Sequence, residues 1–134
     1  RVERMRGTGI EPIFPIWGRP TGELAREMIS AGLQARLTCV DPRALDASFA
    51  GRAFDAAFLA DLPAGVDPCG ERGEFHTFAW SGPMFERPVP VRVGEIVERG
   101  GFVFADLVPN SGSSTPYLRG SQTPGRIFSP PGPP

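Results

Sequence analysis

The segment from residue 67 to residue 77, with the sequence DPCGERGEFHT, concentrates side chains that can do chemistry. It contains carboxylates, a thiol, a hydroxyl and the only histidine of the chain. Glu71 and Glu74 lie on either side of a glycine, so both carboxylates could face one cavity and orient an amine, an ammonium ion or a magnesium ion. His76 could donate a hydrogen bond or move a proton, because an imidazole with a pKa of about 6.5 populates both forms. The alternative is a surface hairpin with its charges in water.

The same segment holds a thiol and two glycines with possible roles in binding. Cys69 and His76 are too few for a zinc site, which normally takes about four nitrogen or sulfur ligands, so we predict no metal site. A Cys–His nucleophile would need the two side chains in contact. Gly70 and Gly73 let the backbone bend sharply or approach a ligand closely. Thr77 either contacts a substrate or is an ordinary strand residue.

Two pairs outside this segment are further candidates. Trp17 and Arg19 follow a predicted strand, and ligands of open α/β sheets bind beyond the carboxyl ends of parallel strands. Alternatively, Trp17 contributes to packing and Arg19 is a charge flanking a helix. Gly51 and Arg52 form the second pair, in which the guanidinium could hold a phosphate or carboxylate through two hydrogen bonds. In the alternative, Arg52 pairs with Asp55 on the surface.

Hydrophobic periodicity predicts the elements that would position these residues. Residues 10–16 read as a short buried strand, and a helix begins with Thr21 as its N-cap and ends before Gly32. Residues 35–40 read as a strand, which makes a βαβ-like unit most simply built with parallel strands. A second helix spans residues 54–62. Strands at 74–80, 89–93 and 102–107, the last two joined by a Gly-Gly turn, predict a β-meander.

Composition sets the class of protein. The chain has 134 residues and 40% hydrophobic residues, enough for one folded domain. A net charge of −1 with scattered arginines gives no reason to expect nucleic acid, and no apolar run approaches the roughly 18–20 residues that span a bilayer. Two cysteines predict free thiols and a cytoplasmic protein. Residues 109–134 are rich in Pro, Gly and Ser and predict a disordered tail.

Four stretches in this order carry a family resemblance: GIEPIFPIWGR at 9–19, TCVD at 38–41, SFAGR at 48–52, and GERGEFHT with a following Gly-Pro at 70–83. Together they resemble the diphthine–ammonia ligase family, from about residue 1 to about residue 109. Such proteins look like N-type ATP pyrophosphatases, which use ATP and magnesium to activate a carboxylate as an acyl-adenylate and let ammonia displace AMP. Arg72 stands where the family pattern has Asn or Gly, and Ser81 stands where Asp commonly precedes Gly-Pro.

The resemblance covers only the C-terminal portion of the family. The Ser-Gly-Gly-Lys-Asp-Ser type nucleotide loop has no counterpart here, and all 14 basic residues are arginine, so we expect this chain alone to bind neither ATP nor magnesium and to be inactive. The predicted fold class is α/β, with the end of a HUP- or Rossmann-like parallel sheet at residues 1–40 and a small mixed α+β domain with a C-terminal meander at 41–108. The chain begins without methionine, as a protein entered part-way would.

The resemblance also implies roles for the candidate residues. The implied catalytic residues are Glu71, Glu74 and His76, and the implied substrate-binding residues are Gly70, Gly73, Thr77, Cys69, Trp17, Arg19, Gly51 and Arg52. The implied substrates are ammonia and a carboxylate that is either a small molecule or protein-bound. The chain could also pair with a second copy or with a missing N-terminal half. The alternative function is a non-catalytic binding or regulatory remnant of the family, or an incomplete gene.

Overall fold

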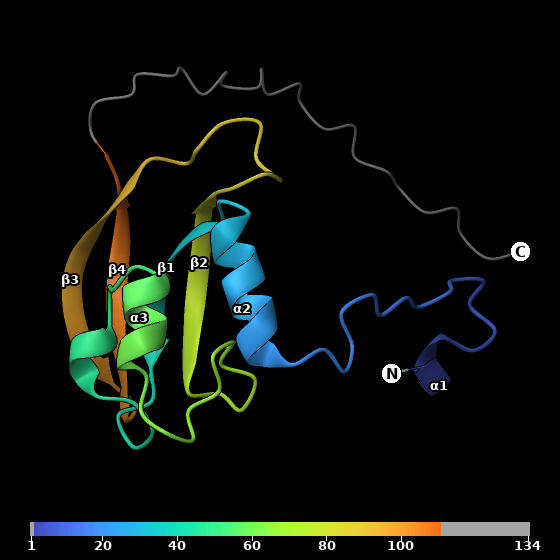
Figure 1. Cartoon of the computed structure of the whole chain (residues 1–134), viewed down its shortest axis with the longest axis horizontal. Helices are drawn as coiled ribbons and strands as arrows, with labels where there is room; N and C mark the ends of the chain where they lie inside the picture. The colour runs from blue at the N-terminus through green and yellow to red at the C-terminus, as the bar shows by residue number, and fades with distance from the viewer. Residues whose placement is uncertain (1, 111–134) are drawn as a thin grey trace, which may run out of the picture.

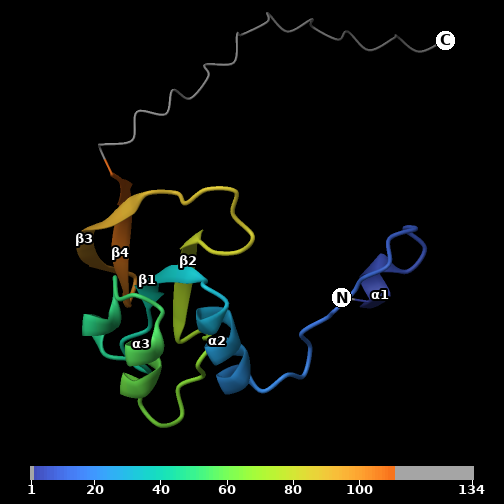
Figure 2. The same cartoon turned by 45° about the horizontal axis from the view of Figure 1, so that its top comes forward.

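The computed structural model describes residues 2–110 as a small α+β fold (Figure 1). One antiparallel sheet has the strand order β2-β1-β4-β3, and helices α2 and α3 cover one of its faces (Figures 1 and 2). The elements in chain order are α1 Val2–Met5, α2 Thr21–Ser30, β1 Gln34–Val40, the 3-10 helix η1 Ala47–Phe49, α3 Ala56–Asp61, β2 Phe75–Ser81, β3 Val91–Arg99 and β4 Phe102–Pro109. None of the helices in this part of the chain is both long and apolar enough to cross a membrane.

The predicted parallel sheet is wrong. Every strand pair within residues 2–110 is antiparallel, and residues 10–16 form no strand. This segment runs away from the sheet with its apolar side chains exposed, for example Ile13 at 78% (Figure 1). Two of its residues are prolines, which have no N–H to donate to a ladder. Both edges of β1 are already paired, one with β2 and the other with β4 and residues 51–54.

The helices α2 and α3 and the β3–β4 hairpin lie where the sequence predicts them. The helix α2 ends as predicted, because Gly32 adopts a φ of +88° and its N–H bonds to the carbonyl of Ile29. The N-cap is Pro20 and not Thr21 as predicted, which leaves the Thr21 hydroxyl available to another partner. The β3–β4 hairpin is confirmed, but β2 pairs with β1, so the last three strands do not form a consecutive meander.

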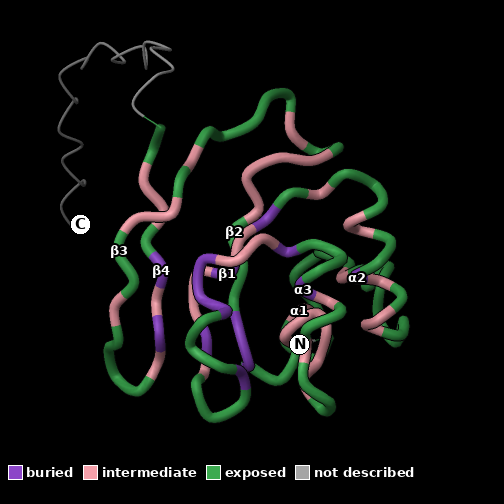
Figure 3. The backbone as a smooth tube through the Cα atoms, turned by 60° about the vertical axis from the view of Figure 1, so that its left-hand side comes forward, coloured by how far each residue is buried: buried purple, intermediate pink, exposed green. Residues whose placement is uncertain are grey.

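The core lies between the sheet and the helices that cover it. Phe58 of α3 is fully buried, and its ring contacts the rings of Phe49, Phe54 and Phe75 at centroid distances of 6.0, 5.4 and 5.3 Å. Among the strands, β1 and β4 carry most of the buried positions, and the segment at residues 45–58, which contains η1 and the start of α3, carries others (Figure 3). Because Phe75 is also the first residue of β2, this core fixes the strand that directly follows the DPCGERGEFHT loop.

The boundaries at residues 40 and 108 stay predictions. The strand β1, which ends at residue 40, lies in the same sheet as β2 and β4. The predicted tail, apart from residues 109 and 110, lies outside the described residues.

Candidate functional site

The loop at residues 67–74, which we call the Asp67 loop, is organised by a carboxylate at its start. Asp67 Oδ1 accepts hydrogen bonds from the main-chain N–H groups of Cys69, at 2.8 Å, and Glu71, at 3.4 Å. Asp67 Oδ2 accepts a hydrogen bond from the hydroxyl of Thr21 at 2.9 Å. Aspartate closes such turns readily because its short side chain reaches main-chain donors two residues on. Asp67 therefore both folds the loop and ties it to the first turn of α2.

A second carboxylate closes the loop at its end. Glu74 is only 6% exposed, and its Oε1 and Oε2 accept hydrogen bonds from the main-chain N–H groups of Asp67 and Arg72, both at 3.0 Å. The carbonyl of Glu74 also accepts a hydrogen bond from the N–H of Asp41, just after β1, at 2.9 Å. A buried carboxylate is tolerated only when its oxygens are hydrogen-bonded, as they are here. Glu74 therefore holds the loop against the sheet.

Hydrogen bonding keeps both of these carboxylates ionised. Burial by itself raises the pKa of Glu74, but the main-chain hydrogen bonds from Asp67 and Arg72 outweigh it, so the pKa of Glu74 lies below its ordinary value. The pKa of Asp67 is lowered in the same way: burial raises it, and the bonds from Cys69 and the Thr21 hydroxyl reverse the effect. The charges that shape the loop are thus present at neutral pH.

The glycines of the loop serve its own folding. Gly70 has a φ of +69°, and a Cβ at this position would lie 2.7 Å from the carbonyl oxygen of Phe75. Of the two roles that the sequence allows, a sharp bend or a close approach to a ligand, Gly70 shows a bend with positive φ and a close approach to the chain's own strand. Gly73 has a φ of +87° with open space around a Cβ position, and its N–H bonds to the carbonyl of Gly70 at 3.0 Å.

Two charged side chains of the loop reach its surface. Glu71 is exposed, and in the described part of the chain only its main-chain N–H takes part in the hydrogen bonds of the loop. Arg72 is also exposed, and its Nη1 donates a hydrogen bond to the carbonyl of Gly65 at 3.3 Å. The two glutamate side chains therefore differ. The carboxylate of Glu74 is buried and hydrogen-bonded inside the loop, whereas the carboxylate of Glu71 is exposed and available to a ligand.

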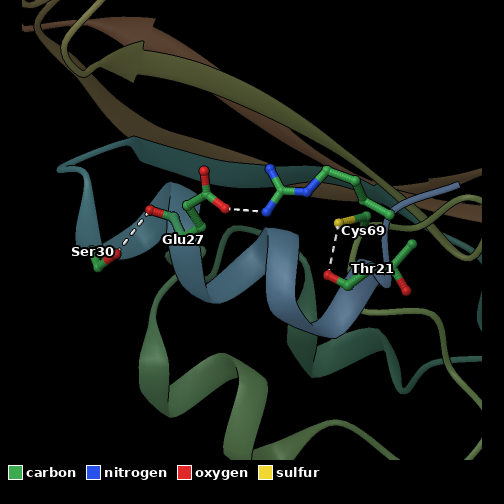
Figure 4. A network of polar contacts seen from close by, with 5 residues as sticks. Thr21, Glu27, Ser30 and Cys69 are labelled. Carbon is green, nitrogen blue, oxygen red and sulfur yellow. Dashed lines mark hydrogen bonds and ion pairs between the residues drawn. The ribbon is translucent and has the colours of Figure 1, made fainter. Parts of the chain in front are cut away.

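The thiol and the histidine of the motif lie apart. Cys69 is half-buried and donates its S–H to the carbonyl of Thr21 at 3.4 Å (Figure 4). Burial, and then the charges of Asp67 and Glu71, raise the pKa of the Cys69 thiol, which disfavours a nucleophilic thiolate. His76 is exposed on β2 and pairs with Cys39 of β1 on the face of the sheet away from the helices.

Thr77, next to His76, is also exposed and pairs with Leu37 of β1. No group of three or more His, Cys, Asp or Glu side chains within residues 2–110 is arranged to hold a metal ion.

The other two candidate pairs make structural contacts. Trp17 is 85% exposed, and Arg19 forms an ion pair with Glu27 of α2. Arg52 pairs with Asp61 at 2.7 Å, rather than with Asp55 as one reading of the sequence had it, and its guanidinium lies 4.6 Å from the centroid of the Phe49 ring. Arg19 and Arg52 thus pair with α2, α3 and η1, and none of their ion pairs or side-chain hydrogen bonds in the described part of the chain is made with the Asp67 loop.

Gly51, the neighbour of Arg52, has a φ of +81° and lies close to β3. A Cβ at this position would be 3.0 Å from Cγ1 of Val93. The glycine therefore permits close packing of the 51–54 segment against the sheet. Whether any of the sequence-predicted site residues touches a substrate stays a prediction.

Three residues join the candidate site that were not among the predicted site residues. Thr21 binds the Asp67 loop, and Asp67 itself anchors it; the Asp-Pro-Cys-Gly turn sequence was the available signal for Asp67. The third is Arg26 of α2. It lies at a cavity of about 280 Å³ between α2, the end of α3 and the segment that enters the loop. No periodicity or motif indicates that Arg26 and Pro68 line the same cavity.

Comparisons with known proteins place these features in a family. Residues 20–105 match the family described as diphthamide synthase C-terminal domain, and this stretch contains α2 and the whole Asp67 loop. A diphthine–ammonia ligase of Homo sapiens is 33% identical over 113 residues, which span 80% of this chain and 42% of the human protein. Diphthine–ammonia ligases of Bos taurus and Danio rerio are each 32% identical, over 113 and 103 residues. The chain thus spans less than half the length of these curated relatives.

Proposed function

The chain belongs to the diphthamide synthase C-terminal domain family, and from this premise we propose that it is the substrate-recognition part of an ATP-dependent ligase that converts a carboxylate into an amide with ammonia. The names of the relatives support the reaction, since each is called a diphthine–ammonia ligase. The substrate carboxylate is carried by a small molecule or by a protein. Activation of that carboxylate is the task of the remaining part of such a ligase.

The observation that carries the proposal is the construction of the Asp67 loop. Its two ends are fixed by the ionised carboxylates of Asp67 and Glu74, while Glu71 is left free at the surface. A rigid loop that presents one charged group is how a protein positions a reacting partner with little loss of entropy on binding. Glu71 holds the incoming ammonium ion and accepts the proton that it must lose before it attacks the activated carbonyl. Glu74 acts through the loop that it positions.

ATP and magnesium do not fit the residues present in this chain. Magnesium takes oxygen ligands in an octahedral arrangement, and the described residues contain no cluster of carboxylates that could supply them. The sequence contains no lysine that could hold the phosphates as a nucleotide loop does. Nucleotide binding is therefore the task of a separate segment or of a partner.

A chimera tests the proposal. In the human diphthine–ammonia ligase, the part that aligns with residues 20–105 of this chain is replaced by those residues, and both ATP–pyrophosphate exchange and amide formation are measured. We expect both activities in the chimera and neither in the 134-residue chain alone. In the chimera, Glu71→Gln should lower the rate of amide formation by about 10²–10⁴-fold and leave ATP–pyrophosphate exchange unchanged, since Gln keeps the size of the side chain and removes its charge.

The matched control is Arg87→Gln, which removes another exposed charge, in the connection between β2 and β3, and should have no effect. A chimera that exchanges pyrophosphate but forms no amide would contradict the proposal. A Glu71→Gln rate within about twofold of the parent would also contradict it and would favour the alternative of a binding or regulatory remnant.

A further inference from the structure

The cavity beside the Asp67 loop is lined by apolar side chains, by main-chain groups and by one cationic side chain. Its volume is about 280 Å³, and its lining includes Leu59, Leu62, Val66 and Pro68 together with Gly22 and Arg26 of α2. Ligand pockets in proteins commonly measure roughly 300–1,000 Å³. The cavity is therefore slightly smaller than this range and suits a short aliphatic group.

The guanidinium of Arg26 lies over Gly22. A Cβ built on Gly22 would be 3.7 Å from Arg26 Nη1, 4.0 Å from Arg26 Nη2 and 3.9 Å from Cγ of Pro68. The missing side chain at Gly22 thus leaves room between the arginine and the loop. These distances are ordinary van der Waals contacts, so a side chain can be added at Gly22 without a steric clash at its Cβ. The added side chain would occupy the space between Arg26 and Pro68.

Arg26 has no carboxylate partner in the described part of the chain, and it is the arginine that lines the cavity. Within residues 2–110 the ion pairs are Arg6–Glu3, Arg19–Glu27, Arg43–Asp41 and Arg52–Asp61, and none includes Arg26. The carboxylate on the loop side, Asp67, is bound by the Thr21 hydroxyl and by the N–H groups of its own turn. The charge of Arg26 is therefore available to an anion from outside the chain.

We propose that this cavity binds the aliphatic arm of the substrate, with the carboxylate of the arm held by Arg26, and this rests on the proposed function. A guanidinium binds a carboxylate through two parallel hydrogen bonds, a geometry that an amide cannot reproduce with equal strength. The apolar side chains of the lining, such as Leu59, Leu62 and Val66, cover the methylene groups of the arm. The cavity thus distinguishes the carboxylate substrate from the amide product, which helps release of the product.

A titration of the 134-residue chain tests this inference without ATP or ammonia. Hexanoate and its neutral analogue hexanamide are added separately, and the main-chain amide signals are followed by NMR. We expect saturable shifts of the Gly22, Gly65 and Val66 amides, with hexanoate binding roughly fivefold to tenfold more tightly than hexanamide. Added salt should reduce this preference, because the arginine is exposed.

Two variants test separately the charge of Arg26 and the open space of the cavity. Arg26→Gln should make hexanoate and hexanamide bind equally, whereas Gly22→Val should fill the cavity and abolish the shifts of the Gly65 and Val66 amides with both ligands. Arg87→Gln is the control for loss of an exposed arginine and should bind hexanoate like the parent. A thermal melt of each variant confirms that it is folded.

The inference is overturned if hexanoate causes no saturable shifts at tens of millimolar, if hexanamide binds the parent equally well, or if Arg26→Gln keeps the preference. Its failure is distinguishable from failure of the proposed function. A chimera that carries Arg26→Gln and forms the amide with an unchanged KM would refute the role of Arg26 alone. Selective binding of hexanoate by the chain, combined with a chimera that forms no amide, would refute the ligase role alone.

Discussion

The substitution Glu74→Gln tests whether a buried charge holds the Asp67 loop in place. In the native chain two main-chain N–H groups, those of Asp67 and Arg72, donate to the two oxygens of Glu74 at 3.0 Å. Glutamine has nearly the same size but offers one oxygen and one NH2 group. One of the two main-chain donors therefore loses its acceptor and faces another donor.

The expected cost follows from that single lost interaction. A hydrogen bond to a charged group contributes about 1.5–3 kcal/mol, and Glu74 is only 6% exposed, so water does not replace the missing acceptor. We expect Glu74→Gln to lower the free energy of unfolding by about 2 kcal/mol. For a domain of this size the midpoint of thermal unfolding then falls by roughly 8–16 °C.

The assay is urea unfolding followed by circular dichroism at neutral pH, with Glu71→Gln as the matched control. Glu71 lies in the same loop and loses the same charge, but its side chain is exposed, so its substitution should change the free energy of unfolding by less than about 0.5 kcal/mol. Equal effects of the two substitutions, or no effect of Glu74→Gln, would refute the assignment of Glu74 to the loop.

The same experiment predicts a dependence on pH. The pKa of folded Glu74 is below its ordinary value of 4.5, so its ionised form stabilises the fold above that value, and the contribution is lost as the pH falls through the folded pKa. The difference in unfolding free energy between the parent and Glu74→Gln should be constant near neutral pH and should narrow in acid below about pH 4.5.

Two further substitutions test how the loop is built. A left-handed backbone costs alanine roughly 1–2 kcal/mol. Gly70→Ala should destabilise the fold by clearly more than this, because its Cβ would lie 2.7 Å from the carbonyl oxygen of Phe75, whereas Gly73→Ala, with open space around its Cβ, should cost only that amount. Equal losses of unfolding free energy in urea would contradict the close approach at Gly70. Thr21→Val should cost about 1 kcal/mol in the same assay by removing the hydroxyl that donates to Asp67, and an unchanged midpoint would mean that this bond does not tie α2 to the loop.

The motif and the local elements could be found in the sequence because they depend on neighbours along the chain. The apolar spacing of residues 24–29 followed by Gly32 predicted α2, and two adjacent glycines between alternating apolar runs predicted the β3–β4 hairpin, in which Gly100 and Gly101 both have positive φ values. The run from Asp67 to Thr77 was selected for its residue types alone. Its glycines allowed either a sharp bend or a close approach to a ligand, and in the structure Gly70 lies close to Phe75 of the chain itself.

Which strands pair with one another could not be predicted from the sequence in the same way. A period of two places side chains on one face of a strand or the other and says nothing about which strand lies beside it. The segment at residues 10–16 has the apolar content of a strand, but a strand exists only where a neighbour satisfies its main-chain groups. Within residues 2–110 the edges of β1 are taken by β2, β4 and residues 51–54, and the expected parallel sheet does not form.

The sequence by itself determined the local elements, the family resemblance and the charged loop, because helical spacing, turn residues and motif order are properties of consecutive residues. Only the tertiary structure decided that Glu74 is buried and bonded while Glu71 is free, and that Arg26 lies across a cavity from Pro68. Two glutamates separated by two residues look equivalent in a sequence. They differ because burial and hydrogen bonding depend on segments brought together from distant positions, here Thr21, Asp41 and the loop itself.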